Sequence, residues 1–327
     1  MSHRQHPIGS GFDAAATADD VLAGVDLSGT NVIVTGGHNG VGLETTRALV
    51  KAGASVTVGA RNIERARSKL GDVHGVEVGR LDLVDPASVD AFVVRWLESG
   101  RELHILINNA GVTASAELVV DDRGYEEQFA TNHLGHFQLT LGLLPALRAA
   151  GGARVVTVSS GAQRFGEICW DDPHFAGRGY DANVAYAQSK LANVLFAVEL
   201  DRRASGDGVR AYAVHPGVVV GTNLNSSVGE DALRQMGLVD DAGDPIIDPE
   251  SGKKTPQQGA STSVFAATSP LLADTGGVYL VDNDVAPLDD DPRPMSAEGP
   301  PTAAMSHSVD PESARRLWEL SEKLLAG

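Results

Sequence analysis

Residues 35–42 read TGGHNGVG, directly after the apolar run NVIVT (31–35) and at the start of a helix-like stretch (40–52). Glycines in such a strand–loop–helix setting allow a tight turn, and they let the backbone approach a pyrophosphate bound at the helix N-terminus. Glycines that only shape a turn are the alternative, but the strand and helix on either side favour a phosphate loop. We therefore expect contacts to a dinucleotide at Gly36, His38, Asn39, Gly40, Val41 and Gly42.

Short apolar runs alternate with longer helix-like stretches along the rest of the chain. This alternation predicts parallel strands connected by helices, and strands that are apolar along their whole length fit a sheet covered on both faces. The predicted fold is α/β, a single-domain Rossmann fold with a doubly wound, mostly parallel seven-stranded sheet and helices on both faces. Strands are expected at 31–35, 55–60, 76–81, 103–108, 154–160, 210–215 and 277–281. Helices are expected at 40–52, 62–70, from Pro86 onward, and at 124–149, 184–204, 256–267 and 313–325.

Three stretches fall outside this alternation. Residues 1–27 are polar, and we expect them to form a flexible N-terminal extension. Residues 218–255 mix apolar and acidic side chains between a strand and a helix. Residues 284–327 are expected to form a C-terminal extension that ends in an amphipathic closing helix. The sequence has no internal repeat and no central linker, so residues 28–283 are expected to form one Rossmann domain.

The composition excludes several classes of partner. The chain has 43 acidic and 26 basic residues and a net charge of −17, so its surface repels nucleic-acid phosphates and anionic membranes. Cys169 is the only cysteine, which excludes an intrachain disulfide and fits a reducing compartment. No apolar run is long enough to span a membrane, and we expect a cytoplasmic protein. The histidines lack the carboxylate or cysteine neighbours of a metal site, so no metal is expected.

The end of the second predicted strand distinguishes the two common dinucleotides. An acidic residue there would hold the ribose hydroxyls of NAD, but this chain has Ala60 followed by Arg61. Arginine pairs with a 2′-phosphate, whereas a carboxylate repels it. The sequence thus predicts NADP(H), with NAD(H) less favoured and a solvated surface arginine as the alternative interpretation of Arg61. Arg65 lies one helical turn further on, where it can assist Arg61 or simply be exposed.

Four motifs follow one another in a fixed order: TGGHNGVG (35–42), NNAG (108–111), VSS (158–160) and YAQSK (186–190). In this combination the sequence resembles the short-chain dehydrogenase/reductase family, over about residues 28–283. Asn39 stands where the extended, epimerase-like branch of that family has a glycine. The insert at 161–185 and the following SKLANVLFAVELDRR are similar to the branch of retinol dehydrogenases and protochlorophyllide reductases.

The resemblance implies further cofactor contacts. Asp82 and Leu83 match the position that contacts the adenine, with an ordinary turn at a strand end as the alternative. Asn109, Ala110 and Gly111 match the turn that supports the sheet and lines the nicotinamide-ribose side. The last implied contacts lie after the sixth strand, at the nicotinamide end, and are Pro216, Gly217, Val219 and Thr222.

Tyr186 and Lys190 are four residues apart, so on a helix their side chains share one face. A nearby lysine cation, together with oxidised nicotinamide, favours the phenolate and lowers the pKa of a tyrosine from its usual value of about 10. The phenol can then donate a proton to a carbonyl oxygen or take one from an alcohol. By resemblance, Ser160 holds the substrate oxygen, with Ser159 as the alternative. The resemblance also implies that Asn132, through its side chain or its backbone, orders a water that links the lysine to solvent.

Together the motifs predict an NADP(H)-dependent oxidoreductase that interconverts a carbonyl group and an alcohol, with the tyrosine as general acid and base. Apolar side chains within 218–247 indicate a fairly hydrophobic small-molecule substrate. Two alternatives share the cofactor motifs: a catalytically silent NADP(H)-binding redox sensor, and a reductase of a carbon–carbon double bond. The resemblance also allows a homodimer or homotetramer packed through long helices.

Overall fold

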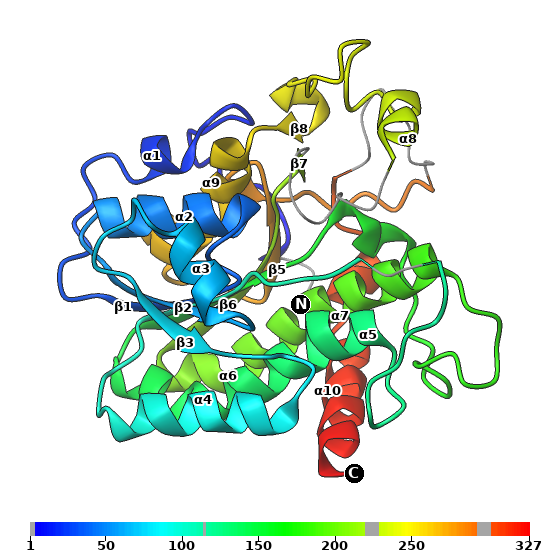
Figure 1. Cartoon of the computed structure of the whole chain (residues 1–327), viewed down its shortest axis with the longest axis horizontal. Coiled ribbons are helices and arrows are strands. Elements are labelled where there is room, and N and C mark those ends of the chain that lie inside the picture. The colour runs from blue at the N-terminus through cyan, green and yellow to red at the C-terminus, as the bar shows by residue number, and fades with distance from the viewer. Residues whose placement is uncertain (1–3, 114–115, 220–228, 293–301) are drawn as a thin grey trace.

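An eight-stranded sheet runs through the centre of the molecule (Figure 1), in the order β10-β9-β6-β5-β4-β1-β2-β3. The computed structural model describes residues 4–113, 116–219, 229–292 and 302–327. All neighbouring strands are parallel except β9 and β10. The strands are β1 (Asn31–Thr35), β2 (Ser55–Ala60), β3 (Glu77–Arg80), β4 (Ile105–Asn108), β5 (Ala153–Val158), β6 (Val209–His215), β9 (Val278–Val281) and β10 (Asp284–Val285).

The strand count differs by one from the prediction. Each of the seven predicted strands is present, and the eighth, β10, is a two-residue strand antiparallel to β9. The chain reverses through Asp282 and Asn283, whose φ angles are 51° and 63°. A two-residue strand has no periodicity of its own, so the sequence could not distinguish it from a loop. The number of strands is corrected from seven to eight, and the mostly parallel α/β Rossmann fold is confirmed.

Helices cover both faces of the sheet (Figure 1). Val32 and Val34 of β1 belong to one apolar core, together with Leu49 and Val264, while Ile33 between them belongs to the other core, as the pleat of a strand requires. The first face carries α1 (Ala18–Val21), α2 (Gly40–Lys51), α3 (Ile63–Lys69) and α9 (Pro256–Thr268). The second face carries α4 (Pro86–Glu98), α6 (Gly135–Ala149), α7 (Ala182–Ala204) and α10 (Pro311–Ala326). No helix in the described parts of the chain is both long enough and apolar enough to cross a membrane.

The long helix predicted at 124–149 has three parts. α5 (Glu127–Phe129) leads into a π-helical turn (Ala130–Leu134), which continues as α6. A π-turn adds a residue to the helical repeat, and such turns are frequent at functional sites. Asn132 lies in this turn, which no residue pattern in the sequence had indicated.

The N-terminal segment packs onto the sheet. The amide Nε2 of Gln5 donates to the carbonyl oxygens of Tyr279, at 2.8 Å, and Ala286, at 2.6 Å, and Tyr279 N donates back to Gln5 Oε1 at 2.9 Å. Further along, Leu22 and its apolar neighbours are buried in the core with α2 and α9. The expectation of a flexible extension is therefore corrected for residues 4–27, because Gln5 hydrogen-bonds the sheet and Val21, Leu22 and Leu27 are buried in the core.

The stretch between β6 and α9 begins and ends in a small second sheet. β7 (Val218–Val219) pairs in parallel with β8 (Lys253–Lys254), and both strands contact α9. α8 (Glu230–Gln235) lies between them in the sequence. The two ends of this stretch are thus held side by side, next to the carboxyl end of β6.

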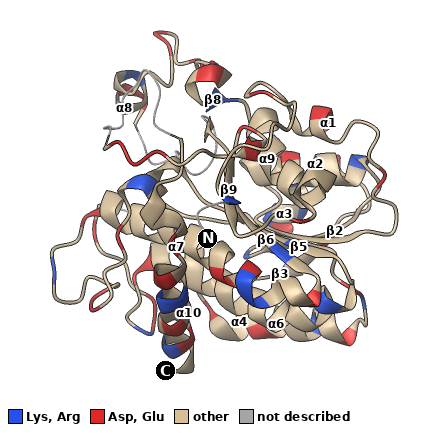
Figure 2. Cartoon of the chain, turned by 180° about the vertical axis from the view of Figure 1, so that it is seen from behind, with Lys and Arg blue, Asp and Glu red and all other residues tan. Residues whose placement is uncertain are grey.

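Acidic and basic residues occur together on the outer helices (Figure 2). Arg315 pairs with Glu319 on α10, and Arg234 pairs with Glu230 on α8. Such surface pairs contribute little to stability one by one, but they leave those arginines occupied. An arginine without a carboxylate partner is therefore a candidate for binding an external anion.

Candidate active site

A cavity of about 650 Å³ lies at the carboxyl ends of the parallel strands, where the strand order reverses between β1 and β4. This is the place, and a typical size, for a dinucleotide site in a doubly wound sheet. Asn132 lies behind the cavity wall, and Thr222 lies outside the described residues. The predicted residues that line the cavity are Gly36, His38, Asn39, Gly40, Val41, Gly42, Arg61, Asp82, Leu83, Asn109, Ala110, Gly111, Ser160, Tyr186, Lys190, Pro216, Gly217 and Val219.

The glycine loop forms a narrow cradle at the start of α2. A Cβ atom on Gly42 would lie 2.4 Å from Asn109 Nδ2 and 2.7 Å from the carbonyl oxygen of Gly36, and Gly36 itself has a φ of 65°. Side chains are thus excluded at Gly42 by space and disfavoured at Gly36 by backbone conformation. The N-cap residue Asn39 makes no side-chain capping hydrogen bond, so the N–H groups of the first turn of α2 remain available to an anion.

Positive charge gathers where β2 ends. Arg61 and Arg65 are exposed and line the cavity, and neither pairs with a carboxylate in the part of the chain that the structure describes. His38 lies beside them, with its Nδ1 buried and without a hydrogen-bond partner among the described residues. Burial and the neighbouring Arg65 hold the pKa of His38 below its usual value. This end of the cavity can therefore receive an anionic group.

Hydrogen bonds through Thr35 tie the NNAG turn to β1. Thr35 Oγ1 accepts hydrogen bonds from the N–H groups of Asn109 and Ala110, both at 2.9 Å, and Asn109 Nδ2 donates to the Thr35 carbonyl oxygen at 2.9 Å. The same hydroxyl lies 2.8 Å from His136 Nε2, so its own proton is donated to that nitrogen. His136 Nδ1 then carries the imidazole proton and donates to the carbonyl oxygen of Asn132 at 3.0 Å.

Ser160, Tyr186 and Lys190 meet at the other end of the cavity. Tyr186 and Lys190 lie one turn apart on α7, and Lys190 Nζ is 5.5 Å from the centre of the Tyr186 ring. Lys190 is 3% exposed, and its Nζ donates to the carbonyl oxygen of Val158 at 3.2 Å. Ser160 is hydrogen-bonded to the Tyr186 phenol, and its Oγ accepts from Ala162 N at 3.2 Å. A hydroxyl, a phenol and an ammonium group are thus brought together.

The two neighbouring serines have different environments. Ser159 is 2% exposed, and its hydroxyl donates to the carbonyl oxygen of Lys190 at 2.7 Å. That bond uses its proton to fasten β5 to α7. Ser160 is partly exposed in the cavity and contacts the phenol, so the geometry favours Ser160 over Ser159 as the serine that meets a substrate.

Burial dominates the proton affinities at this end. It raises the pKa of Tyr186 above its usual value, and the hydrogen bond with Ser160 offsets only part of that rise. It lowers the pKa of Lys190 to about 8. We expected the lysine and an oxidised cofactor to lower the pKa of Tyr186; in the protein alone the shift has the opposite sign, because desolvation of the phenolate outweighs the other effects.

Asn132 uses its side chain within the protein. Its Oδ1 accepts from Val112 N at 2.8 Å, and its Nδ2 donates to the Val112 carbonyl oxygen and to Ser189 Oγ, both at 3.0 Å. The residue is fully buried in the π-turn. Its amide therefore joins Val112, directly after the NNAG turn, to α7 next to Lys190. That Asn132 orders a water, through its side chain or its backbone, stays a prediction.

The sequence matches the protein family described as short chain dehydrogenase over residues 30–233, which is more than half of the chain. This chain belongs to that family. It is 43% identical over 307 residues to a protein named "Probable oxidoreductase" from Streptomyces lividans, covering 92% of this chain and 99% of that protein. It is 44% identical over 202 residues to retinol dehydrogenase 12 of Mus musculus, covering 60% of this chain and 63% of that one. The similarity to the retinol dehydrogenase branch is thereby confirmed.

Solved structures share the fold of this short-chain dehydrogenase. An uncharacterised protein from Mycobacterium paratuberculosis has a TM-score of 0.70 and 32% identity, covering 95% of this chain and 98% of that one. A structure described as an NAD(P)-dependent gluconate 5-dehydrogenase from Beutenbergia cavernae, with NADP bound at low occupancy, has a TM-score of 0.60 and 25% identity, covering 79% and 96%. In that structure the fold is therefore found with a nicotinamide dinucleotide.

The short-chain dehydrogenase cavity also contains residues that the sequence had not indicated. His215 is 4% exposed and lines the cavity. Its position directly before Pro216, a predicted cofactor contact, was the signal in the sequence that could have indicated it. Within the described residues, no group of three or more His, Cys, Asp or Glu side chains is placed to hold a metal ion. The further lining residues are Thr35, Gly59, Asn62, Leu81, Val84, Val112, Thr113, Glu127, Thr131, Val158, His215 and Val218.

Proposed function

We propose that this chain is an NADP(H)-dependent oxidoreductase that interconverts a carbonyl group and an alcohol on fairly hydrophobic small molecules. The observation that carries the proposal is the meeting of Ser160, Tyr186 and Lys190 in the same cavity as the glycine loop. Carbonyl reduction needs a proton donor beside a hydride carrier, and this cavity offers a donor next to a dinucleotide cradle.

The residues of the cavity fit an NADP(H) molecule. The side-chain-free cradle at Gly36 and Gly42, with the uncapped N-terminus of α2, suits the pyrophosphate. Arg61 and Arg65, which have no carboxylate partner among the described residues, suit a 2′-phosphate, and this supports NADP(H) over NAD(H). When bound, the cofactor supplies the hydride for carbonyl reduction or accepts it in alcohol oxidation.

We assign the proton to Tyr186. Because burial raises the pKa of its phenol, the group stays protonated at neutral pH and can donate to a carbonyl oxygen as negative charge develops there. Ser160 holds the same oxygen through its hydroxyl. Lys190 is largely charged below a pH of about 8 and stabilises the phenolate that remains. In the reverse direction that phenolate takes the proton of the alcohol.

We assign Asn132 a positioning role in this reaction. Its amide bonds to Val112 and Ser189 connect the cofactor side of the cavity to the helix turn that carries Lys190. The neutral His136 holds the carbonyl of the same asparagine, and burial lowers the pKa of His136 to about 4. The hydrogen bonds of Asn132 and His136 are therefore kept over the neutral pH range.

A substrate panel tests the proposal directly. NADPH oxidation should occur with apolar ketones or aldehydes and should be slow with small, highly charged carbonyl compounds. Turnover confined to the charged compounds would reject the hydrophobic substrate class. NADPH binding with no turnover on any carbonyl compound would favour the redox sensor, and products saturated at a double bond would favour the other alternative.

Three further predictions concern the whole chain. We propose residues 28–283 as the catalytic domain, since they contain all the described residues that line the cavity, with 284–327 as a C-terminal extension. A cytoplasmic location stays a prediction. Association into a homodimer or homotetramer also stays a prediction, to be tested by light scattering.

A further inference from the structure

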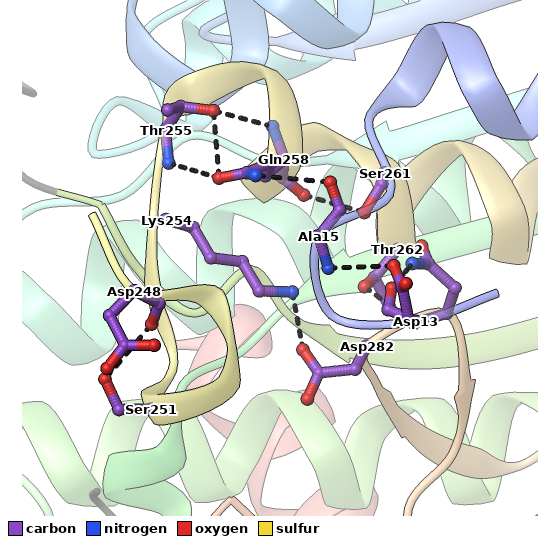
Figure 3. A network of polar contacts seen from close by, with 11 residues as sticks. Asp13, Ala15, Asp248, Ser251, Lys254, Thr255, Gln258, Ser261, Thr262 and Asp282 are labelled. Atoms are coloured by element: carbon purple, nitrogen blue, oxygen red, sulfur yellow. Dashed lines mark hydrogen bonds and ion pairs between the residues drawn. The ribbon is translucent and has the colours of Figure 1, made fainter. Parts of the chain in front are cut away.

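Lys254 is a buried cation close to the cavity, and the proposed mechanism does not use it. Its side chain is fully buried, and its Nζ lies 2.5 Å from Asp282 Oδ1 (Figure 3). An ammonium group removed from water needs such a partner, and Asp282 is 35% exposed. The pair connects β8 to the turn that follows β9.

The stem of Lys254 lies against the cavity wall. Gly217 has a φ of 79°, and a Cβ atom there would lie 2.9 Å from Lys254 Cδ and 2.9 Å from the carbonyl oxygen of Gly252. Val218 N donates to that same carbonyl oxygen at 2.8 Å. Gly217 and Val218 both line the cavity. A shift of the lysine stem would therefore displace the turn that follows β6.

The turn that contains Asp282 is fixed by hydrogen bonds of the next residue, Asn283. Asp282 and Asn283 both have left-handed backbone angles, which cost free energy for residues other than glycine and must be held by their surroundings. Asn283 N donates to Thr262 Oγ1 at 3.2 Å, and Asn283 Nδ2 donates to the carbonyl oxygen of Asp13 at 3.1 Å. The turn is thus fastened to α9 and to the N-terminal segment.

The N-terminal segment and α9 also fasten the lysine side of the pair (Figure 3). Thr255, the residue after Lys254, forms a capping box with Gln258: Thr255 N donates to Gln258 Oε1 at 3.0 Å, and Gln258 N donates to Thr255 Oγ1 at 3.2 Å. Gln258 Nε2 donates to the carbonyl oxygen of Ala15 at 3.2 Å. Asp13 and Ala15 therefore bond to residues next to the ion pair: Asp13 to Asn283, which follows Asp282, and Ala15 to Gln258, which caps the helix that begins after Lys254.

We propose that the Lys254–Asp282 pair positions the turn His215–Val219 and thereby sets how the nicotinamide half of the cofactor is held. Neither member of the pair lines the cavity, so both are positioning residues that act through the turn. The N-terminal segment takes part because it fixes the pair. The inference rests on the proposed function in one respect, the assignment of this end of the cavity to nicotinamide.

Two ligands separate positioning from general stability. Lys254→Met removes the charge and keeps a stem of similar length. NADPH should bind this variant roughly tenfold more weakly than wild type, or worse. In contrast, 2′,5′-ADP lacks the nicotinamide half and should contact only the Arg61 end, so its affinity should stay within about twofold. Calorimetric titration of the full chain measures both dissociation constants.

Arg210→Met is the matched control. Arg210 Nε lies 3.1 Å from Asp201 Oδ1, in a pair whose side chains are 18% and 3% exposed. Arg210 lies at the start of β6, and His215 ends the same strand. Loss of this pair should lower the melting temperature, as loss of the Lys254–Asp282 pair should. It should leave the ratio of the NADPH and 2′,5′-ADP affinities unchanged.

Asp282→Asn removes the opposite charge and covers the case in which Lys254→Met does not fold. It should show the same selective loss of NADPH affinity. Equal weakening of both ligands, an equal selective loss in Arg210→Met, or unchanged NADPH binding in the folded Lys254 or Asp282 variant would overturn the inference. The titrations need no turnover, so failure of the proposed activity is a separate outcome; if NADH binds more tightly than NADPH, NADH and ADP are the ligand pair.

Discussion

The two ends of the cavity hold cations in opposite environments. Arg61 and Arg65 are exposed beside β2, whereas Lys190 is 3% exposed within α7. Water and salt screen the exposed charges, and burial shifts the proton affinity of the enclosed one. Positive charge therefore has a different role at each end: cofactor binding at the exposed end and proton transfer at the buried end. Substitutions, pH and salt should affect the two ends separately.

The largest effect is expected at the buried end, from Tyr186→Phe. Without the phenolic proton, kcat should fall by about 10²–10⁴-fold, while the dissociation constant of NADPH stays within a few-fold. Steady-state kinetics and fluorescence titration measure the two quantities. Tyr125→Phe is the matched control, because its hydroxyl donates to the carbonyl oxygen of Leu324 at 2.9 Å and Tyr125 does not line the cavity. Unchanged kcat in Tyr186→Phe would remove the phenol from the mechanism.

Lys190 should give the next largest effect and the clearest pH dependence. Burial lowers its pKa to about 8, so its positive charge is lost as pH rises through that value, earlier than for an exposed lysine. The kcat/KM for NADPH should therefore fall above a pH of about 8. Lys190→Met should lower kcat on the order of 10²-fold and remove this alkaline decline.

The exposed Lys51→Met on α2 is the control for the pH profile and should keep the decline. If the alkaline decline persisted in Lys190→Met, another group would be responsible for it.

At the exposed end, Arg61→Ala should weaken NADPH binding by about 10- to 100-fold, because a hydrogen bond to a charged group is worth about 1.5–3 kcal/mol. NADH, which lacks the 2′-phosphate, should bind almost as before, and kcat at saturating NADPH should change little. Arg315→Ala, on α10, is the control for loss of a surface arginine. Equal weakening of NADPH and NADH would contradict the assignment of Arg61 to the 2′-phosphate.

The smallest effect should come from salt. Raising ionic strength from about 0.01 M to about 0.15 M shortens the screening length from about 30 Å to about 8 Å, so the KM for NADPH should rise several-fold. The kcat should stay constant, since the groups that transfer the proton are enclosed. A kcat that fell in parallel with NADPH affinity would mean that the two ends are not separate.

The ends of the cavity also differ from the rest of the molecule in how well the sequence predicts them. The glycine loop and the Tyr186–Lys190 pair are local patterns, since each depends on residues within one turn or one loop. Most of the longer strands were predictable for the same reason, through their short apolar runs. Patterns of this kind can be recognised within a short window of the sequence, without knowledge of the fold.

Contacts between distant segments left no such signal. Asn132 could be placed near the site, but its bonds to Val112 and Ser189 depend on a π-turn and on packing between helices. The polar N-terminal segment has a composition typical of a flexible extension, although Gln5 hydrogen-bonds a strand more than 270 residues away in the sequence. Lys254 is one of two adjacent lysines to which the sequence analysis assigned no role, and only the fold places it against Asp282.

Hydride transfer from deuterium-labelled NADPH tests the central proposal most directly. With a hydrophobic ketone and NADPH deuterated at the transferred position of the nicotinamide, mass spectrometry and NMR should find one deuterium on the carbon that carries the new hydroxyl group. Tyr186→Phe should produce almost none of this product. Deuterium on a former double-bond carbon, or NADPH binding without any transfer, would contradict the account.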